Sequence, residues 1–284
     1  MSGLNKDKDT TYFRYDIVTR KLDTVGKEKK KYPMWASVSP DGKVGVFAKG
    51  SNLWIMDSTN LRKAAVNEKD TTLVEYKLTT DGIRQFGYGY GNYTGDTEKD
   101  STKRHNPGHI VWSPDSRHFA TMKWDMRKLS DLWVINSVKG KRPELETYKY
   151  QMPGEAGPKG YLLMFTLDGL KATSKEIKSE AFKDQEVNFL NAKHLAKDNY
   201  LDYRTSKWLG DDSGFYLVRQ SRDLKRLDLC WVAVGADSTK TIISERERTY
   251  IEYRNPYLVK GGKQLVWWSE RNGWANLYLY DSDG

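Results

Sequence analysis

The segment from Phe86 to Gly108 carries side chains whose types and spacing could contact a ligand. Its tyrosines alternate with glycines in "FGYGYGNYTGDTEKD", and acidic residues follow them. Aromatic rings can stack on a ligand, and carboxylates can hold a positively charged group. The same composition also fits a solvated loop whose tyrosines fix it to its own domain, so both interpretations stay open. The candidate binding residues are Tyr88, Tyr90, Tyr93, Asp96, Glu98 and Asp100.

Three common catalytic or cofactor motifs are absent from the sequence. No serine lies in the G-x-S-x-G elbow of the α/β-hydrolases, and "GDDSG" at Gly210 has the wrong spacing. His105 and His109 are four residues apart, but the intervening Pro107 and Gly108 disfavour a helix that would align them on a metal. The glycine-rich "GYGYGNY" lacks the Lys-Ser/Thr pair of a phosphate-binding loop. We therefore expect no catalysis by this chain alone, and neither a metal nor another cofactor.

A phrase of alternating apolar residues that ends in Asp or Asn recurs along the chain. Its copies are "YFRYD", "NLWIMD", "DLWVIN" and "NLYLYD", and "DLCWVAVGAD" is a weaker copy. Three copies follow a second strand-like run, "KVGVFAK", "RHFATMKW" or "KQLVWWSE", and a turn such as "SPDGK" precedes each run. Pro, Asp and Gly favour tight turns, and alternation favours strands. The repeated unit predicts an all-β fold, a β-propeller of four-stranded blades. A β-sandwich with similar turns is the alternative.

The spacing of the repeats predicts how the blades are arranged. Asp16 and Asp57 are 41 residues apart, close to one blade, whereas Asp57 and Asn136 are 79 apart. The segment between Phe86 and Gly108 accounts for the excess, and a second insertion at 139–169 extends the following blade. We count about three full blades with a partial blade at each end. Residues 1–284 are therefore expected to be a partial β-propeller.

Charge and cysteine content narrow the functions that the sequence allows. The net charge is +9, yet acidic residues are interleaved with the basic ones, which favours a solvated surface over a face that binds nucleic acid. Asp125, Arg127, Lys128 and Asp131 are expected to form structural ion pairs. Cys230 lies in an apolar run and is expected to be buried. The sequence shows no apolar run that could span a membrane and no signal peptide.

Three stretches occur in a fixed order: "WSPDSRHFATMKWDMRKLSDLWVIN", "ETYKYQMPGEAGPKGYLLMF" and "WWSERNGWANLYLYD". Together they resemble the N-terminal propeller of dipeptidyl peptidase IV and related prolyl-oligopeptidase-type (S9) serine peptidases. In that family a Trp-Ser-Pro turn opens a blade, a Tyr-Pro-x-Ala-Gly-like stretch follows, and a Ser-Glu/Asp-x-x-Gly-Trp/Tyr hairpin comes later. The resemblance covers roughly residues 35–284, and the lack of paired cysteines is similar to bacterial members.

The resemblance implies a propeller of eight blades followed by an α/β-hydrolase domain that this chain lacks. The propeller would gate and bind the peptide substrate, and the hydrolase would supply Ser, Asp and His. The parent protein would be a serine-type dipeptidyl peptidase, exported to the periplasm, with a homodimer as a further expectation.

The resemblance also bears on the acidic segment. Dipeptidyl peptidases of the family hold the substrate's free amine with two adjacent glutamates before a Trp-Ser-Pro turn. The matching region, Phe86 to Gly108, has no Glu-Glu pair. Asp96, Glu98 and Asp100 are the candidates to replace it, and their different spacing puts release of dipeptides in doubt.

Two other functions remain open from the sequence. A propeller without catalytic partners could be a scaffold that binds proteins or glycans through face loops and aromatic platforms. A nucleic-acid-binding module would require Lys and Arg to gather on one face, and its binding would weaken steeply with salt.

Overall fold

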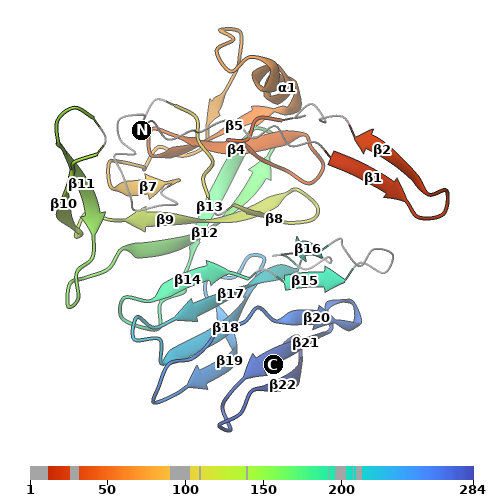
Figure 1. Cartoon of the computed structure of the whole chain (residues 1–284), viewed down its shortest axis with the longest axis vertical. Coiled ribbons are helices and arrows are strands. Elements are labelled where there is room, and N and C mark those ends of the chain that lie inside the picture. Colours follow the sequence, from red (N-terminus) through yellow and green to blue (C-terminus); the bar gives the residue numbers. More distant parts are fainter. Residues whose placement is uncertain are drawn as a thin grey trace.

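The fold is nearly all β, and the residues that the structure describes form one α-helix and one short 3₁₀-helix besides the strands (Figure 1). The computed structural model describes residues 12–25, 32–89, 103–108, 110–138, 140–190, 192–195, 203–206, 208 and 213–284. Within these ranges, four sheets of four or five strands follow one another along the chain, and two separate hairpins accompany them. The series of four- or five-stranded sheets, each packed on the next, confirms the all-β class and is the arrangement of propeller blades, whereas a sandwich has two sheets. The number of blades stays a prediction.

The first large sheet contains the first Ser-Pro-Asp-Gly turn. In this turn Ser39 Oγ donates a hydrogen bond to Asp41 Oδ1 at 2.7 Å. Gly42 adopts a φ of 71°, a conformation that glycine takes without strain. Val46 and Phe47 point to opposite faces and are both buried, so the sheet is covered on both sides. Its strands are β3 (Ser37–Val38), β4 (Val44–Lys49), β5 (Asn52–Asp57) and β6 (Tyr76–Lys77).

Helix α1 (Ser58–Val66) connects β5 to β6, where the sequence indicated only a connection. Asp57 caps it, because its Oδ1 accepts a hydrogen bond from the Asn60 amide at 2.8 Å. Leu61 and Ala64 lie one turn apart and are buried with β4 and β5. The helix was missed because only this narrow face is apolar.

Replacing the cap residue tests this local account. Asp57→Ala is expected to lower the free energy of unfolding by about 1 kcal/mol, because the Asn60 amide loses its acceptor. Urea denaturation measures the change. Asp57→Asn keeps an acceptor oxygen and should stay within a few tenths of wild type. Equal losses in both variants would contradict the capping role.

The second large sheet has a different third strand from the one that the sequence indicated. β9 pairs with β12 over Asp125↔Lys159 to His118↔Thr166, and "DLWVIN" is not part of this sheet. The rings of Phe119 and Phe165 stack across the two strands, with centroids 4.7 Å apart. The strands are β7 (Phe86–Tyr88), β8 (Val111–Trp112), β9 (His118–Asp125), β12 (Lys159–Asp168) and β13 (Lys171–Ile177).

"DLWVIN" instead forms β10 (Ser130–Asn136), which pairs with β11 (Glu144–Tyr150) in a separate hairpin. We call this pair the arm hairpin; it projects at the left of Figure 1. Trp133 and Ile135 on β10 are each 70% exposed. β12 is buried on both faces, with Leu162 and Met164 packed toward the third sheet and Phe165 toward the first. The second insertion, at 139–169, therefore supplies β11 of the arm hairpin and also β12, the third strand of the second sheet.

The third and fourth large sheets confirm the other repeats. Cys230 lies on β18 and is fully buried, as expected. β15 joins the fourth sheet by a single parallel pair, Lys193↔Tyr257. The third sheet comprises β14 (Glu186–Phe189), β17 (Gly214–Gln220), β18 (Arg226–Ala233) and β19 (Lys240–Arg246). The fourth comprises β16 (Tyr203–Ser206), β15 (Ala192–Leu195), β20 (Tyr257–Val259), β21 (Gln264–Ser269) and β22 (Asn276–Asp281), with the 3₁₀-helix Lys260–Gly262 between β20 and β21.

Apolar clusters between neighbouring sheets hold the stack together. One joins Val46 of the first sheet to Phe165 of the second, and another joins Leu162 of the second to Phe215 of the third. A further cluster joins the third sheet to the fourth. The second hairpin outside the large sheets is β1 (Tyr12–Asp16) with β2 (Lys21–Val25).

Two buried carboxylates reinforce the third sheet and its junction with the fourth. Asp228 is 1% exposed and accepts hydrogen bonds from Arg219 and Ser244, each at 2.8 Å. Arg246 forms a further ion pair with it at 2.8 Å. Burial alone would raise the pKa of Asp228, but these donors outweigh it and lower the pKa below its ordinary value. Glu245 on β19 accepts from the Trp267 indole on β21 at 3.0 Å and so links the two sheets.

Candidate functional site

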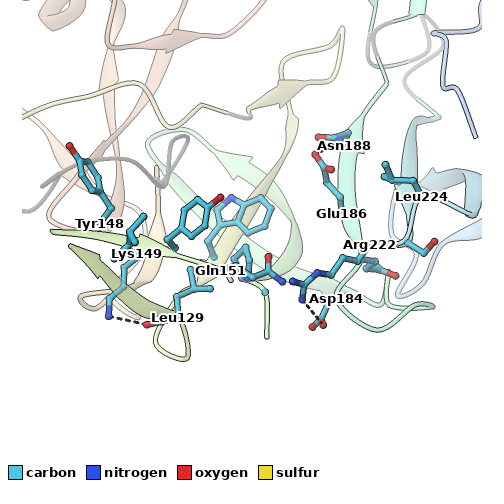
Figure 2. Close-up of a pocket in the computed structure, with 16 residues that line it drawn as sticks. Leu129, Tyr148, Lys149, Gln151, Asp184, Glu186, Asn188, Arg222 and Leu224 are labelled. Carbon is cyan, nitrogen blue, oxygen red and sulfur yellow. Dashed lines mark hydrogen bonds and ion pairs between the residues drawn. The ribbon is translucent and has the colours of Figure 1, made fainter. Parts of the chain in front are cut away.

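A cavity of about 870 Å³ lies between the base of the arm hairpin and the third sheet (Figure 2). Its walls come from segments that are distant in the sequence, so it exists only in the folded chain. This size is within the usual range of small-molecule and peptide sites. The residues that line it are Trp124, Leu129, Leu132, Tyr148, Lys149, Tyr150, Gln151, Gly157, Pro158, Asp184, Gln185, Glu186, Asn188, Ser221, Arg222 and Leu224.

The wall on the side of the arm hairpin is aromatic and aliphatic. Trp124 lies near the end of β9, Leu132 lies on β10 and Tyr150 lies on β11. Tyr150 is 50% exposed, so its ring is available to a ligand. Leu129, buried before the hairpin begins, adds aliphatic surface. Such a wall binds apolar groups and the faces of planar or cationic groups.

β14 supplies a polar wall because its residues alternate in direction. Val187 and Phe189 point into the core, whereas Glu186 and Asn188 are exposed and line the cavity. Figure 2 shows Glu186 and Asn188 together on this wall. Asn188 Nδ2 donates a hydrogen bond to Glu186 Oε1 at 2.9 Å, which orients the carboxylate. Within the described part of the chain, Oε2 of Glu186 has no hydrogen-bond partner.

Arg222 lies at one end of the cavity and ties the turn between β17 and β18 to the segment after the arm hairpin. Its guanidinium donates to the carbonyl oxygen of Met152 at 3.1 Å and also to that of Glu155. It lies 3.7 Å from the Asp184 carboxylate (Figure 2). This cation is therefore engaged by partners of the chain itself.

Lys149, the other cation that lines the cavity, is also engaged. Its ammonium group lies 2.9 Å from the Asp131 carboxylate and donates to the Leu129 carbonyl oxygen at 3.0 Å. Glu186 is then the lining carboxylate that forms no ion pair with another residue in the described ranges. The cavity therefore combines an apolar wall with one oriented, uncompensated negative charge.

The start of the connection to the arm hairpin is fixed by a second ion pair. Arg127 donates to both carboxylate oxygens of Asp125, at 2.9 and 2.7 Å, and its guanidinium lies 4.4 Å from the Phe86 ring centroid. The hydrogen bonds from Arg127 lower the pKa of Asp125, although burial opposes them. The expectation of structural ion pairs is confirmed for Asp125 with Arg127 and for Asp131, which pairs with Lys149, whereas Lys128 forms no ion pair among the described residues.

The residues selected from the sequence do not line this cavity where the structure describes them. Tyr88 lies on β7, is 1% exposed and packs edge-on against Phe165. Its hydroxyl donates to Asp81 Oδ1 at 3.3 Å, and burial raises its pKa. It thus contributes to the core between the first and second sheets. Tyr90, Tyr93, Asp96, Glu98 and Asp100 lie outside the described residues, and their binding role stays a prediction.

Sequence reasoning missed Glu186, Tyr150 and Arg222, because each comes from a different structural unit. The alternation of "EVNF" indicates that Glu186 faces away from the core, but it does not say what lies opposite. Only the pairing of β9 with β12 brings the arm hairpin beside β14.

Two general features of the described residues limit the chemistry of the site. No group of three or more His, Cys, Asp or Glu side chains within them could hold a metal ion. Of the helices that they form, none has both the length and the apolar character needed to cross a membrane.

Comparison with known families gives a match over nearly the whole chain. Residues 6–284 match the model of the dipeptidyl peptidase IV (DPP IV) N-terminal region. This range includes every element described above.

Two solved structures share the fold. A crystal structure of dipeptidyl peptidase 4 from Porphyromonas gingivalis matches 96% of this chain with a TM-score of 0.60 and 18% identity. A structure of a putative dipeptidyl aminopeptidase IV from Bacteroides ovatus matches 96% with a TM-score of 0.56 and 14% identity. The chain covers 34% and 32% of these proteins, about a third of their length.

Proposed function

Because the chain belongs to the dipeptidyl peptidase IV N-terminal region family, we propose that it is the propeller part of a peptidase that acts on peptides. In this proposal residues 1–284 gate and bind the substrate, and an α/β-hydrolase domain of the parent protein cleaves it by serine chemistry. The observation that carries the proposal is the family match over residues 6–284, together with the matching of a third of two dipeptidyl peptidase chains.

The cavity at the arm hairpin supports the binding part of this proposal. It offers apolar surface and an oriented carboxylate, and its volume suits a short peptide. The arm hairpin also exposes Trp133 and Ile135, which favours contact with another part of the parent protein or with a second copy of it. We place the parent protein in the bacterial periplasm, as the resemblance to exported peptidases implies.

The proposal assigns binding to residues 1–284 and cleavage to the rest of the parent protein, and hydrolysis assays test this assignment. Purified residues 1–284 are expected to leave Xaa-Pro and Xaa-Ala chromogenic substrates intact, because the sequence has no nucleophile elbow. The parent protein should hydrolyse them and lose activity on treatment with a serine-directed phosphonate.

Phosphonate-sensitive turnover by residues 1–284 alone would contradict this division. A parent reading frame without a G-x-S-x-G elbow, Asp and His would contradict the peptidase. It would favour the second candidate, a propeller scaffold, for which the exposed arm hairpin is the supporting observation.

A further inference from the structure

We propose that the cavity between the arm hairpin and β14 binds an organic cation, an ammonium or guanidinium group, carried by a peptide beside an apolar side chain. That the ligand is a peptide rests on the proposed function, whereas its positive charge is inferred from the cavity itself. Glu186 is the residue that receives the cation.

The charge of the cavity carries the first step. Four charged side chains line it: Lys149, Asp184, Glu186 and Arg222. Both cations are compensated within the chain, Arg222 by Asp184 and Lys149 by Asp131. Glu186 remains without an ion pair in the described residues, so it is the lining charge that is open to a cationic ligand.

The orientation of Glu186 carries the second step. Asn188 donates to Oε1 at 2.9 Å and holds the carboxylate on the wall of the cavity (Figure 2). Oε2 is left to accept from a ligand. Hydrogen bonds from cations to carboxylates are roughly twice as strong as neutral ones, and a pre-oriented acceptor loses less side-chain entropy on binding.

The opposite wall carries the third step. Trp124 and Tyr150 place aromatic rings in the same cavity, and cations are attracted to the faces of such rings. Leu129, Leu132 and Leu224 add aliphatic surface for a neighbouring apolar group. A cation held between a carboxylate and an aromatic wall is selected over a neutral polar group of equal size.

Two other ligand classes fit the cavity less well. An anion would meet no uncompensated cation among the described lining residues, because Lys149 and Arg222 are both paired. A divalent metal ion such as Ca²⁺ requires six to eight oxygen ligands, and one free carboxylate beside an aromatic wall does not supply them.

Three capped tripeptides separate the sources of the cation. Ac-Leu-Arg-Leu-NH₂ carries only a side-chain cation, Leu-Gln-Leu-NH₂ only an N-terminal ammonium, and Ac-Leu-Gln-Leu-NH₂ neither. Titration calorimetry with residues 1–284 should show binding of at least one charged peptide about tenfold or more tighter than the neutral peptide. The preferred charged peptide identifies whether the site reads a side chain or a peptide terminus.

Matched variants assign the effect to the cavity. Glu186→Gln should weaken the charged peptide about tenfold or more and leave the neutral peptide unchanged. Glu176→Gln removes an exposed glutamate of β13 that does not line the cavity, and it should bind like wild type. Tyr150→Leu keeps apolar surface and should weaken the charged peptides selectively.

Equal binding of charged and neutral peptides, or no binding of any, would overturn this inference. So would an unchanged preference in Glu186→Gln with its fold intact by circular dichroism. The proposed function is judged separately, by hydrolysis in the parent protein, which does not depend on these titrations.

Discussion

Asp228→Ala is expected to lower the free energy of unfolding by about 3–5 kcal/mol, a large share of the stability of a domain. Asp228 is 1% exposed and lies between the guanidinium groups of Arg219 and Arg246. Its removal leaves two like charges facing each other, and that of Arg219 is largely buried. Urea denaturation followed by tryptophan fluorescence measures the loss.

The control for this variant is an exposed ion pair of similar length. Glu252 lies 2.9 Å from Arg254 with both side chains well exposed, so Glu252→Ala should cost less than about 1 kcal/mol. Comparable losses in the two variants would contradict the importance that we give to burial.

The same residue should make the fold sensitive to acid. Since the pKa of Asp228 is lower in the folded chain than its ordinary value, its carboxylate contributes stability fully above about pH 4. That contribution is lost as the pH falls through the lowered folded-state pKa. As the pH falls below about 4, the free energy of unfolding of the wild type should therefore decrease more than that of Asp228→Ala.

Gly82→Ala is expected to lower the free energy of unfolding by about 1–3 kcal/mol or more, the usual cost of overpacking. A Cβ at this position would lie 2.0 Å from the Ser51 carbonyl oxygen, a backbone atom that cannot rotate away. The Gly82 amide also donates to Asn52 Oδ1 at 3.0 Å, and Thr79 donates to the same oxygen. Displacing Gly82 disturbs this buried network, and the midpoint of thermal unfolding should fall.

Gly140→Ala is the matched control for the added methyl group. The nearest atom to its Cβ would be the Arg142 carbonyl oxygen at 3.8 Å, an ordinary contact. Its stability should stay within about 0.5 kcal/mol of wild type. A Gly82→Ala protein as stable as this control would show that the chain at Ser51 can move.

The sequence was a good guide to where strands lie and a poor guide to which strands pair. Alternation identified β4, β5, β9, β18, β21 and β22, because it depends on residues next to each other. It also identified β10 as a strand but assigned it to the wrong sheet. Pairing depends on which strand can bury both faces between neighbouring sheets, and Phe165 and Leu162 of β12 satisfy that condition.

The candidate site was harder to predict for the same reason. Glu186 lies on β14, Tyr150 on β11 and Arg222 between β17 and β18, so they line one cavity only in the folded chain. None of the three stands out by its neighbours in sequence. The glycines on either side of Tyr88 suggested a binding residue, yet Tyr88 is closely packed in the core. In this chain glycines beside an aromatic residue indicate tight contact between strands.

The arm hairpin leaves and re-enters the second sheet at a single point, since Asp125 and Lys159 are partners in the ladder of β9 and β12. Residues 130–150 can therefore change in length or composition without shifting the register of any strand in the large sheets. One wall of the cavity thus belongs to a segment outside the large sheets, and the carboxylate wall belongs to the third sheet. Exchange of this hairpin would therefore change the aromatic wall of the cavity and leave Glu186 in place on β14.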